Sequence, residues 1–151
     1  MVDIPKDKDN SAFSFMNWKK VTKKTSDQYK LRQRYENYDS KGLAEINGRK
    51  VIACVPRFGA IGDEVEVTFQ KKVYYWNKTS GTLFAIIGDY KDENDSNCDQ
   101  WGHLYGKTQR SVVEFIVGDN FCGHIKDKGN FPELKNNPVI KIQRTGVRFN
   151  F

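Results

Sequence analysis

The sequence lacks any apolar run long enough to cross a membrane, and it lacks the best-known motifs of several enzyme classes. No segment approaches the roughly 18 consecutive apolar residues of a transmembrane helix. The N-terminal residues do not form the apolar core of a secretory signal, so we expect a soluble chain that is not exported by the general route. There is also no glycine-rich phosphate loop, no HExxH motif and no GxSxG motif. The common nucleotide-binding, zinc-protease and serine-hydrolase classes are therefore not indicated.

Cysteine is scarce as well. Three cysteines, Cys54, Cys98 and Cys122, make an odd number without CxxC spacing, which argues against both a disulfide framework and a zinc knuckle. Cys54 lies in an apolar stretch and is interpreted as a small core residue. Pairing of Cys98 with Cys122 stays open.

One acidic segment invites a metal interpretation. Asp92, Asn94 and Ser96 have the spacing that begins an EF-hand loop, but the glycine at its sixth position and the glutamate at its twelfth are absent. We interpret the segment as a solvated loop and expect neither a metal nor a cofactor. Histidine is equally rare, and His124, one of only two, is interpreted as structural or solvated.

What the chain does have is aromatic residues and short apolar segments. Ten Phe, seven Tyr and three Trp accompany a hydrophobic fraction of only 38%, which favours a small aromatic-rich β domain. Ser26 could cap one or two helical turns up to Tyr35. Short strands are predicted at Arg49–Val55, Glu64–Phe69, Val73–Trp76, Thr82–Ile87, Val112–Val117, Val139–Gln143 and Val147–Phe151. This pattern predicts an all-β barrel or sandwich.

Charge divides the chain into two predicted parts, an N-terminal arm at residues 1–38 and a β domain at residues 39–151. Seven basic residues and one acid lie between Trp18 and Arg34, so this segment holds the whole net charge of +6. Such an arm could steer the protein toward nucleic acid or an anionic cell-wall polymer. A solvated flank that promotes solubility is the alternative.

Two carboxylates stand out against the apolar strands. Asp89 follows Gly88 at a strand end, and Glu114 interrupts the run Val112–Val117. If their strands are adjacent, each acid disfavours ionisation of the other, so one could remain protonated as a catalytic acid. The alternative is a polar residue on a solvent-facing strand surface and an ordinary Gly-Asp turn.

The long polar loop Gly88–Arg110 between these acids adds candidate substrate-binding residues. Trp101 and Tyr105 could stack on sugar rings, and His103 could donate hydrogen bonds or help to transfer protons. The alternative is a loop held against the domain by Trp101 and Tyr105, with His103 merely exposed.

The order of four segments resembles a known family. Val51–Pro56, Gly59–Val67, Ala85–Asp89 and Val112–Ile116 resemble the double-psi β-barrel of the three-aspartate domains, which are related to rare lipoprotein A and membrane-bound lytic transglycosylase A. The Gly-Asp strand end, the Trp-Gly-His loop and the Val-Glu-Phe-Ile-Val strand also resemble domains of Gram-positive phage tail and cell-wall proteins. The resemblance implies a six- to seven-stranded double-psi β-barrel preceded by the basic arm.

It also implies an activity, lytic transglycosylase cleavage of peptidoglycan glycan strands. In this comparison Asp89 takes the place of the family's middle aspartate and Glu114 that of the last, while Val55 stands where the first would be. One acid would protonate the glycosidic oxygen while the sugar's own 6-hydroxyl closes an anhydro ring. The lost acid means that the site could be altered or inactive.

Three interpretations therefore compete. The first is a wall-directed enzyme that acts from a virion tail or after host lysis, having been synthesised in the cytoplasm. The second is a non-catalytic module of the same fold that binds glycan or other tail subunits. The third is an OB-like nucleic-acid-binding protein, which we do not favour because the excess charge is confined to the arm rather than to the strands. No membrane partner is expected.

Overall fold

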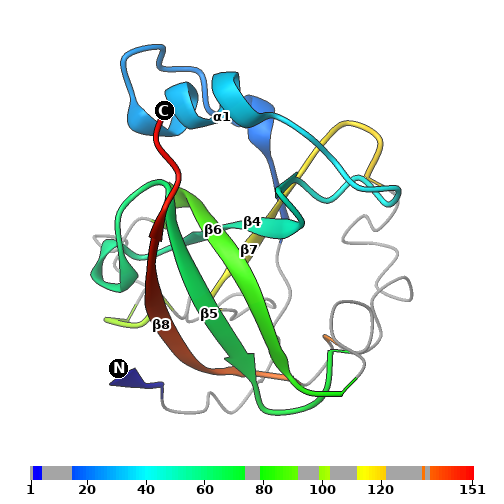
Figure 1. Ribbon diagram of the computed structural model, residues 1–151, viewed down its shortest axis with the longest axis vertical. Helices are drawn as coiled ribbons and strands as arrows, with labels where there is room; N and C mark the ends of the chain where they lie inside the picture. Colours follow the sequence, from blue (N-terminus) through cyan, green and yellow to red (C-terminus); the bar gives the residue numbers. More distant parts are fainter. Residues whose placement is uncertain are drawn as a thin grey trace.

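Strand β4 (Arg49–Cys54) is an interior strand of a curled mixed sheet (Figure 1). The computed structural model describes residues 2–4, 15–73, 79–91, 99–102, 112–121, 134 and 137–151. Seven of the described strands follow one hydrogen-bonded path in the order β1-β8-β5-β6-β4-β7-β2, and β3 (Glu45–Ile46) pairs with β4 beside it. The other strands of the path are β1 (Val2–Asp3), β2 (Phe15–Asn17), β5 (Asp63–Phe69), β6 (Thr82–Tyr90), β7 (Glu114–Val117) and β8 (Val139–Arg148).

The apolar patterns of the sequence explain the middle of this sheet. Every residue of β4 after Arg49 is buried, as expected for an apolar strand paired on both sides. In β5, Val65, Val67 and Phe69 lie in the core, while Glu66 and Thr68 between them are half-exposed. The predicted strand is therefore confirmed, with its period-two burial from Val65 to Phe69, whereas Glu64 at its start is buried. Cys54 is fully buried, and this burial raises the pKa of its thiol to about 12, which confirms it as a core residue.

Several strand ends differ from the prediction. Strand β6 continues past Ile87 to Tyr90, and β7 begins at Glu114 rather than at Val112. The predicted strand Val139–Gln143 and the start of the predicted strand Val147–Phe151 form one strand, β8, because a bulge around Gly146 (φ 93°) absorbs the break between them. Strand β8 ends at Arg148, so the rest of the second prediction, residues 149–151, is wrong. Val73 is buried outside any strand, and the rest of the strand predicted at Val73–Trp76 lies outside the described residues.

The described part of the predicted arm packs against the sheet. Strand β2 pairs with β7 in parallel and leads into a 3-10 turn, η1 (Trp18–Lys20), whose Trp18 is fully buried. Helix α1 (Asp27–Tyr35) follows, and the Ser26 hydroxyl accepts a hydrogen bond from the Tyr29 N–H at 3.1 Å, which confirms the predicted cap. Leu31 of α1 belongs to the same core cluster as β4. No described helix is long and apolar enough to cross a lipid bilayer.

The C-terminal residues reach this helix (Figure 1). The Tyr35 hydroxyl donates a hydrogen bond to the Asn150 carbonyl oxygen at 2.5 Å, and the Tyr35 ring meets Phe149 edge to face. Helix α1 is thereby held between β6 and the end of the chain.

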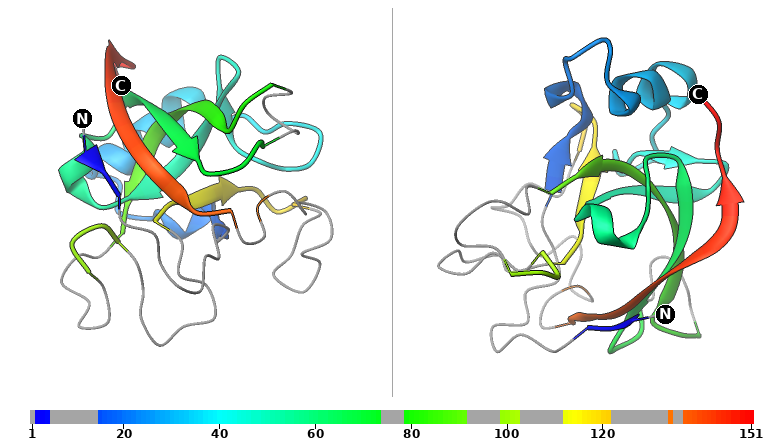
Figure 2. Two further views of the ribbon diagram at one scale, coloured as in Figure 1. Left: turned by 90° about the horizontal axis from the view of Figure 1, so that it is seen from below. Right: turned by 90° about the vertical axis from the view of Figure 1, so that its left-hand side faces the viewer.

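The all-β prediction is confirmed in part: the described fold is mostly β with one short helix, and hydrogen bonds do not close the sheet into a barrel. Among the described residues, the path ends at β1 on one side and at β2 on the other. These two strands pair only with β8 and β7, respectively, and not with each other. Figure 2 shows how strongly the sheet nevertheless curls. Strand twist supplies this curvature, whereas closure needs the edge strands to meet.

Gly88 allows β4 and β6 to approach each other, which gives a first prediction. A Cβ atom at Gly88 would lie 2.3 Å from Cγ1 of Val51. We expect Gly88→Ala to lower the free energy of unfolding by about 1–3 kcal/mol, because an overpacked core must shift its side chains or backbone. Urea denaturation measures this loss.

The double variant Gly88→Ala/Val51→Ala provides the control. It removes the clashing methyl group of Val51, so the double variant should be more stable than the sum of the two single losses predicts. Strictly additive losses would contradict the proposed contact.

Candidate functional site

The two predicted acids flank one residue of strand β4. Ala53 of β4 is the register partner of Asp89 on β6 and of Glu114 on β7. Because register partners in a sheet project toward the same face, Asp89 and Glu114 lie on one face, with β4 between them. Two strand spacings put their Cα atoms about 10 Å apart. The structure thus brings these two residues together from separate parts of the chain.

A β-bulge sets the direction in which Asp89 points. Strand β4 pairs Ile52 with Ile87 and then Ala53 with Asp89, so Gly88 is the extra residue in β6. Without this shift, Gly88 would be the partner of Ala53, and Asp89 would project toward the opposite face. The Gly-Asp pair is therefore part of a β-bulge within β6 and not a turn.

Burial changes the acidity of Asp89. Its carboxylate is half-buried, Oδ1 accepts a hydrogen bond from the Tyr90 N–H at 2.8 Å, and the Gln28 side chain also hydrogen-bonds to it. Burial raises the pKa of Asp89, and the negative charge of Glu114 raises it further, while these hydrogen bonds lower it. The net effect is a raised pKa, as expected for a carboxyl group that transfers protons.

Gln28 gives the same carboxylate a structural contact. It belongs to the first turn of α1, and this helix packs against β6. The hydrogen bond between Gln28 and Asp89 therefore joins the helix to the sheet. Asp89 can hold α1 in place whether or not it takes part in catalysis.

Trp101 is the one predicted sugar-binding residue that lies among the described residues. It is half-buried, its ring stacks on Phe58 with centroids 6.4 Å apart, and the Arg57 guanidinium lies 4.5 Å from its ring centre. Trp101 thus packs against η2 (Pro56–Phe58), the 3-10 turn that follows β4. His103 and Tyr105 lie outside the described residues, as does His124.

No metal site is found in the part of the chain that the structure describes, where no group of three or more His, Cys, Asp or Glu side chains gathers. Of the acidic segment Asp92–Asp99, only Asp99 is described, and its carboxylate accepts a hydrogen bond from the Trp101 N–H at 2.9 Å.

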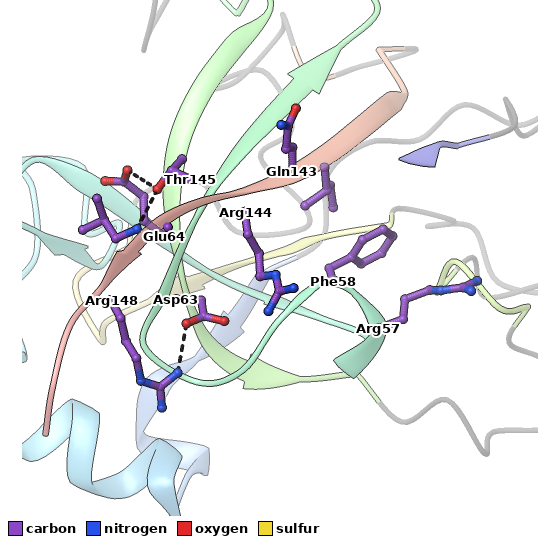
Figure 3. A pocket seen from close by; sticks show the side chains of 11 residues that line it. Arg57, Phe58, Asp63, Glu64, Gln143, Arg144, Thr145 and Arg148 are labelled. Carbon is purple, nitrogen blue, oxygen red and sulfur yellow. Dashed lines mark hydrogen bonds and ion pairs between the residues drawn. The ribbon is translucent and has the colours of Figure 1, made fainter. Parts of the chain in front are cut away.

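A second feature, which the sequence did not reveal, is a pocket of about 760 Å³ between β8 and the segment from η2 to the start of β5 (Figure 3). Neither Asp89 nor Glu114 lines it. Its walls are formed by Arg57, Phe58, Asp63, Glu64, Ile142, Gln143, Arg144, Thr145, Gly146, Val147 and Arg148. Arg144 and Arg148 share β8, whereas Arg57 belongs to η2, so the three arginines line one pocket only because β8 packs against η2.

Comparisons with known proteins give no further assignment. No protein-family model, curated protein or solved structure matches the chain. The geometry of the Asp89–Glu114 pair and the arginine-lined pocket is therefore the basis for the proposals that follow.

The raised pKa of Asp89 predicts a pH dependence of stability. Because its pKa in the folded protein lies above the ordinary value of 3.8, ionisation of Asp89 favours unfolding. Its contribution to stability is fully present below that value and is lost as the pH rises through the folded-state pKa. We therefore expect Asp89→Asn to gain stability relative to the wild type between about pH 3 and pH 7 in urea denaturation series.

Asp119→Asn is the control with the opposite sign. Hydrogen bonds from Lys19 and Asn17 lower the pKa of Asp119. The wild type should therefore gain stability relative to Asp119→Asn as the pH rises. If the difference in free energy of unfolding between Asp89→Asn and the wild type did not change with pH, this would contradict the raised pKa of Asp89.

Proposed function

We propose that this protein cleaves peptidoglycan glycan strands in a reaction of the lytic transglycosylase type, with Asp89 and Glu114 as its two acids. The observation that carries the proposal is their placement on either side of Ala53, together with the raised pKa of Asp89. A pair of carboxyl groups with one held protonated is what glycosidic cleavage requires.

In this proposal Asp89 is the proton donor. Its proton passes to the glycosidic oxygen as the bond from that oxygen to C1 of the sugar breaks. The 6-hydroxyl oxygen of the same sugar then bonds to C1, and its proton passes to Glu114. The charge of Glu114 also stabilises the oxocarbenium-like transition state before the ring closes. Trp101, His103 and Tyr105 remain the proposed sugar-binding residues.

The double-psi β-barrel and the virion-associated location belong to the same proposal. The curled mixed sheet supports the fold, since its interior strand β4 is parallel to β6 and antiparallel to β7. The proposed partners are glycan strands and other subunits of a phage tail, which the protein would meet in the virion or after host lysis.

A non-catalytic module of the same fold is the second candidate function. Position 55, where the resemblance places the first aspartate of the family, holds a fully buried valine and therefore offers no acid. The hydrogen bond between Gln28 and Asp89 also gives Asp89 a structural task. Such a module would bind glycan or a neighbouring subunit without cleaving anything.

Digestion of purified peptidoglycan tests the enzymatic proposal. Mass spectrometry of the products should detect muropeptides that end in an anhydro sugar. Asp89→Asn and Glu114→Gln should each lower the rate by about 100-fold or more, because the loss of an acid or base has this effect on proton transfer.

Glu66→Gln is the matched control, because Glu66 is a half-exposed acid on β5 that pairs with Phe84, away from Ala53. It should digest peptidoglycan at the wild-type rate. Intact peptidoglycan in every reaction would reject the enzyme. Sedimentation of the protein with that intact material would then support the binding module, and salt-sensitive retention on DNA would support the nucleic-acid interpretation.

A further inference from the structure

Arg144 has an unusual position in the pocket beside β8. Its side chain extends from β8 toward the segment that precedes β5 (Figure 3). The stem of Arg144 passes close to Gly59, where an added Cβ atom would lie 3.2 Å from the Arg144 Cδ atom. An added Cβ atom would also lie 3.0 Å from the Asp63 Oδ2 atom and 3.0 Å from the Ile87 Cδ1 atom, so a side chain at position 59 would crowd this side of the pocket. Because Gly59 has no side chain, the stem of Arg144 has space here, and the exposed Arg144 side chain lines the pocket.

Both acids of the pocket already have partners for each of their carboxylate oxygens. Asp63 accepts a hydrogen bond from Arg148 at 2.9 Å and another from the Ala60 N–H at 2.9 Å. Glu64 accepts one from the Thr145 hydroxyl at 2.7 Å and one from Arg49. Burial raises the pKa of Glu64, but these two hydrogen bonds and the positive charge of Arg49 together outweigh it, so the pKa is lowered and Glu64 stays ionised and paired.

The other arginines are engaged as well. Arg148 is bound to Asp63, and Arg57 lies over Trp101 and donates a hydrogen bond to the Gln100 carbonyl oxygen at 3.3 Å. Among the described residues that line the pocket, Arg144 is thus the cation without an acid partner or an aromatic ring. The buried ring of Phe58 forms an apolar wall beside it.

We propose that this pocket binds the oxyanion group of a small ligand, a carboxylate or a phosphate, and that Arg144 is its main contact. A planar guanidinium group donates two parallel hydrogen bonds to either group, and such charge-assisted bonds are among the strongest in proteins. Gln143 and Thr145 also line the pocket, but the Thr145 hydroxyl already donates its proton to Glu64, so Arg144 carries the proposal. The pocket is separate from Asp89 and Glu114, so the proposal does not depend on glycan cleavage.

Titration with two simple anions tests this proposal. The whole chain is titrated with inorganic phosphate or with acetate at constant ionic strength, and ¹H–¹⁵N NMR follows the amides of Gly59, Arg144 and Gly146. We expect saturable shifts confined to these amides and their neighbours. If phosphate binds more tightly than acetate, the ligand is a phosphate, and if acetate binds more tightly, it is a carboxylate. Saturable binding of either anion supports the site.

Three variants distinguish specific anion binding at Arg144 from non-specific attraction by the positive charge of the protein. Arg144→Gln should weaken binding about tenfold or more, and Arg144→Lys should retain part of the affinity because it keeps the charge but loses the planar pair of donors. Arg34→Gln is the matched control, because Arg34 is an exposed arginine of α1 outside the pocket. It should bind as the wild type does.

Two results would overturn the proposal. One is the absence of saturable shifts with both anions in a folded wild-type protein. The other is an equal loss of affinity in Arg34→Gln and Arg144→Gln, which would mean that net charge alone attracts the anion. Unfolding curves of each variant establish that the comparison is made on folded proteins.

Discussion

Strand β4 must be buried on both faces and paired along both edges, and the rest of the sheet is arranged to meet this demand. Its apolar residues Val51–Cys54 are fully covered, with β6 along one edge and β7 along the other. At its start, buried Lys50 is paired with Asp39 at 2.7 Å and with Glu45 at 3.0 Å, because a buried ammonium group needs carboxylate partners. These pairs hold the preceding turn and β3 against the strand.

The same pairing decides where the acids of the proposed site lie. Register partners of Ala53 must share its face, and the bulge at Gly88 makes Asp89 rather than Gly88 one of those partners. Helix α1 then packs against β6 and brings Gln28 to the Asp89 carboxylate. Partial burial and the nearby negative charge of Glu114 are direct consequences of this arrangement, and both raise the pKa of Asp89.

Local patterns in the sequence predict most of the elements but not how they pair. Alternation identifies β5, a continuous apolar run identifies β4, and Ser26 identifies the start of α1. The parallel pairing of β2 with β7 joins segments about 100 residues apart, and no local pattern encodes such a contact. For the same reason, closure of the sheet was expected and is not seen in the hydrogen bonding of the described strands.

The residues of the candidate site could likewise be identified from local sequence, but most of their contacts could not. Asp89 and Glu114 could be identified because acids are conspicuous beside apolar strands, and their juxtaposition followed from assuming adjacent strands. In the fold each pairs with β4 rather than with the other's strand. The pocket around Arg144 could not be foreseen, because it forms only when the bulged end of β8 meets the segment after β4. Nor could the sequence reveal that Arg57 and Phe58 contact the Trp101 ring.

The central claim is that burial and the charge of Glu114 together raise the pKa of Asp89. The most direct measurement is ¹³C NMR titration of the Asp89 carboxyl group in the wild type and in Glu114→Gln. The wild-type pKa should lie above the ordinary value of 3.8, and it should fall in the variant because one negative charge is removed. A wild-type Asp89 with an ordinary pKa, unchanged by the loss of Glu114, would contradict the account.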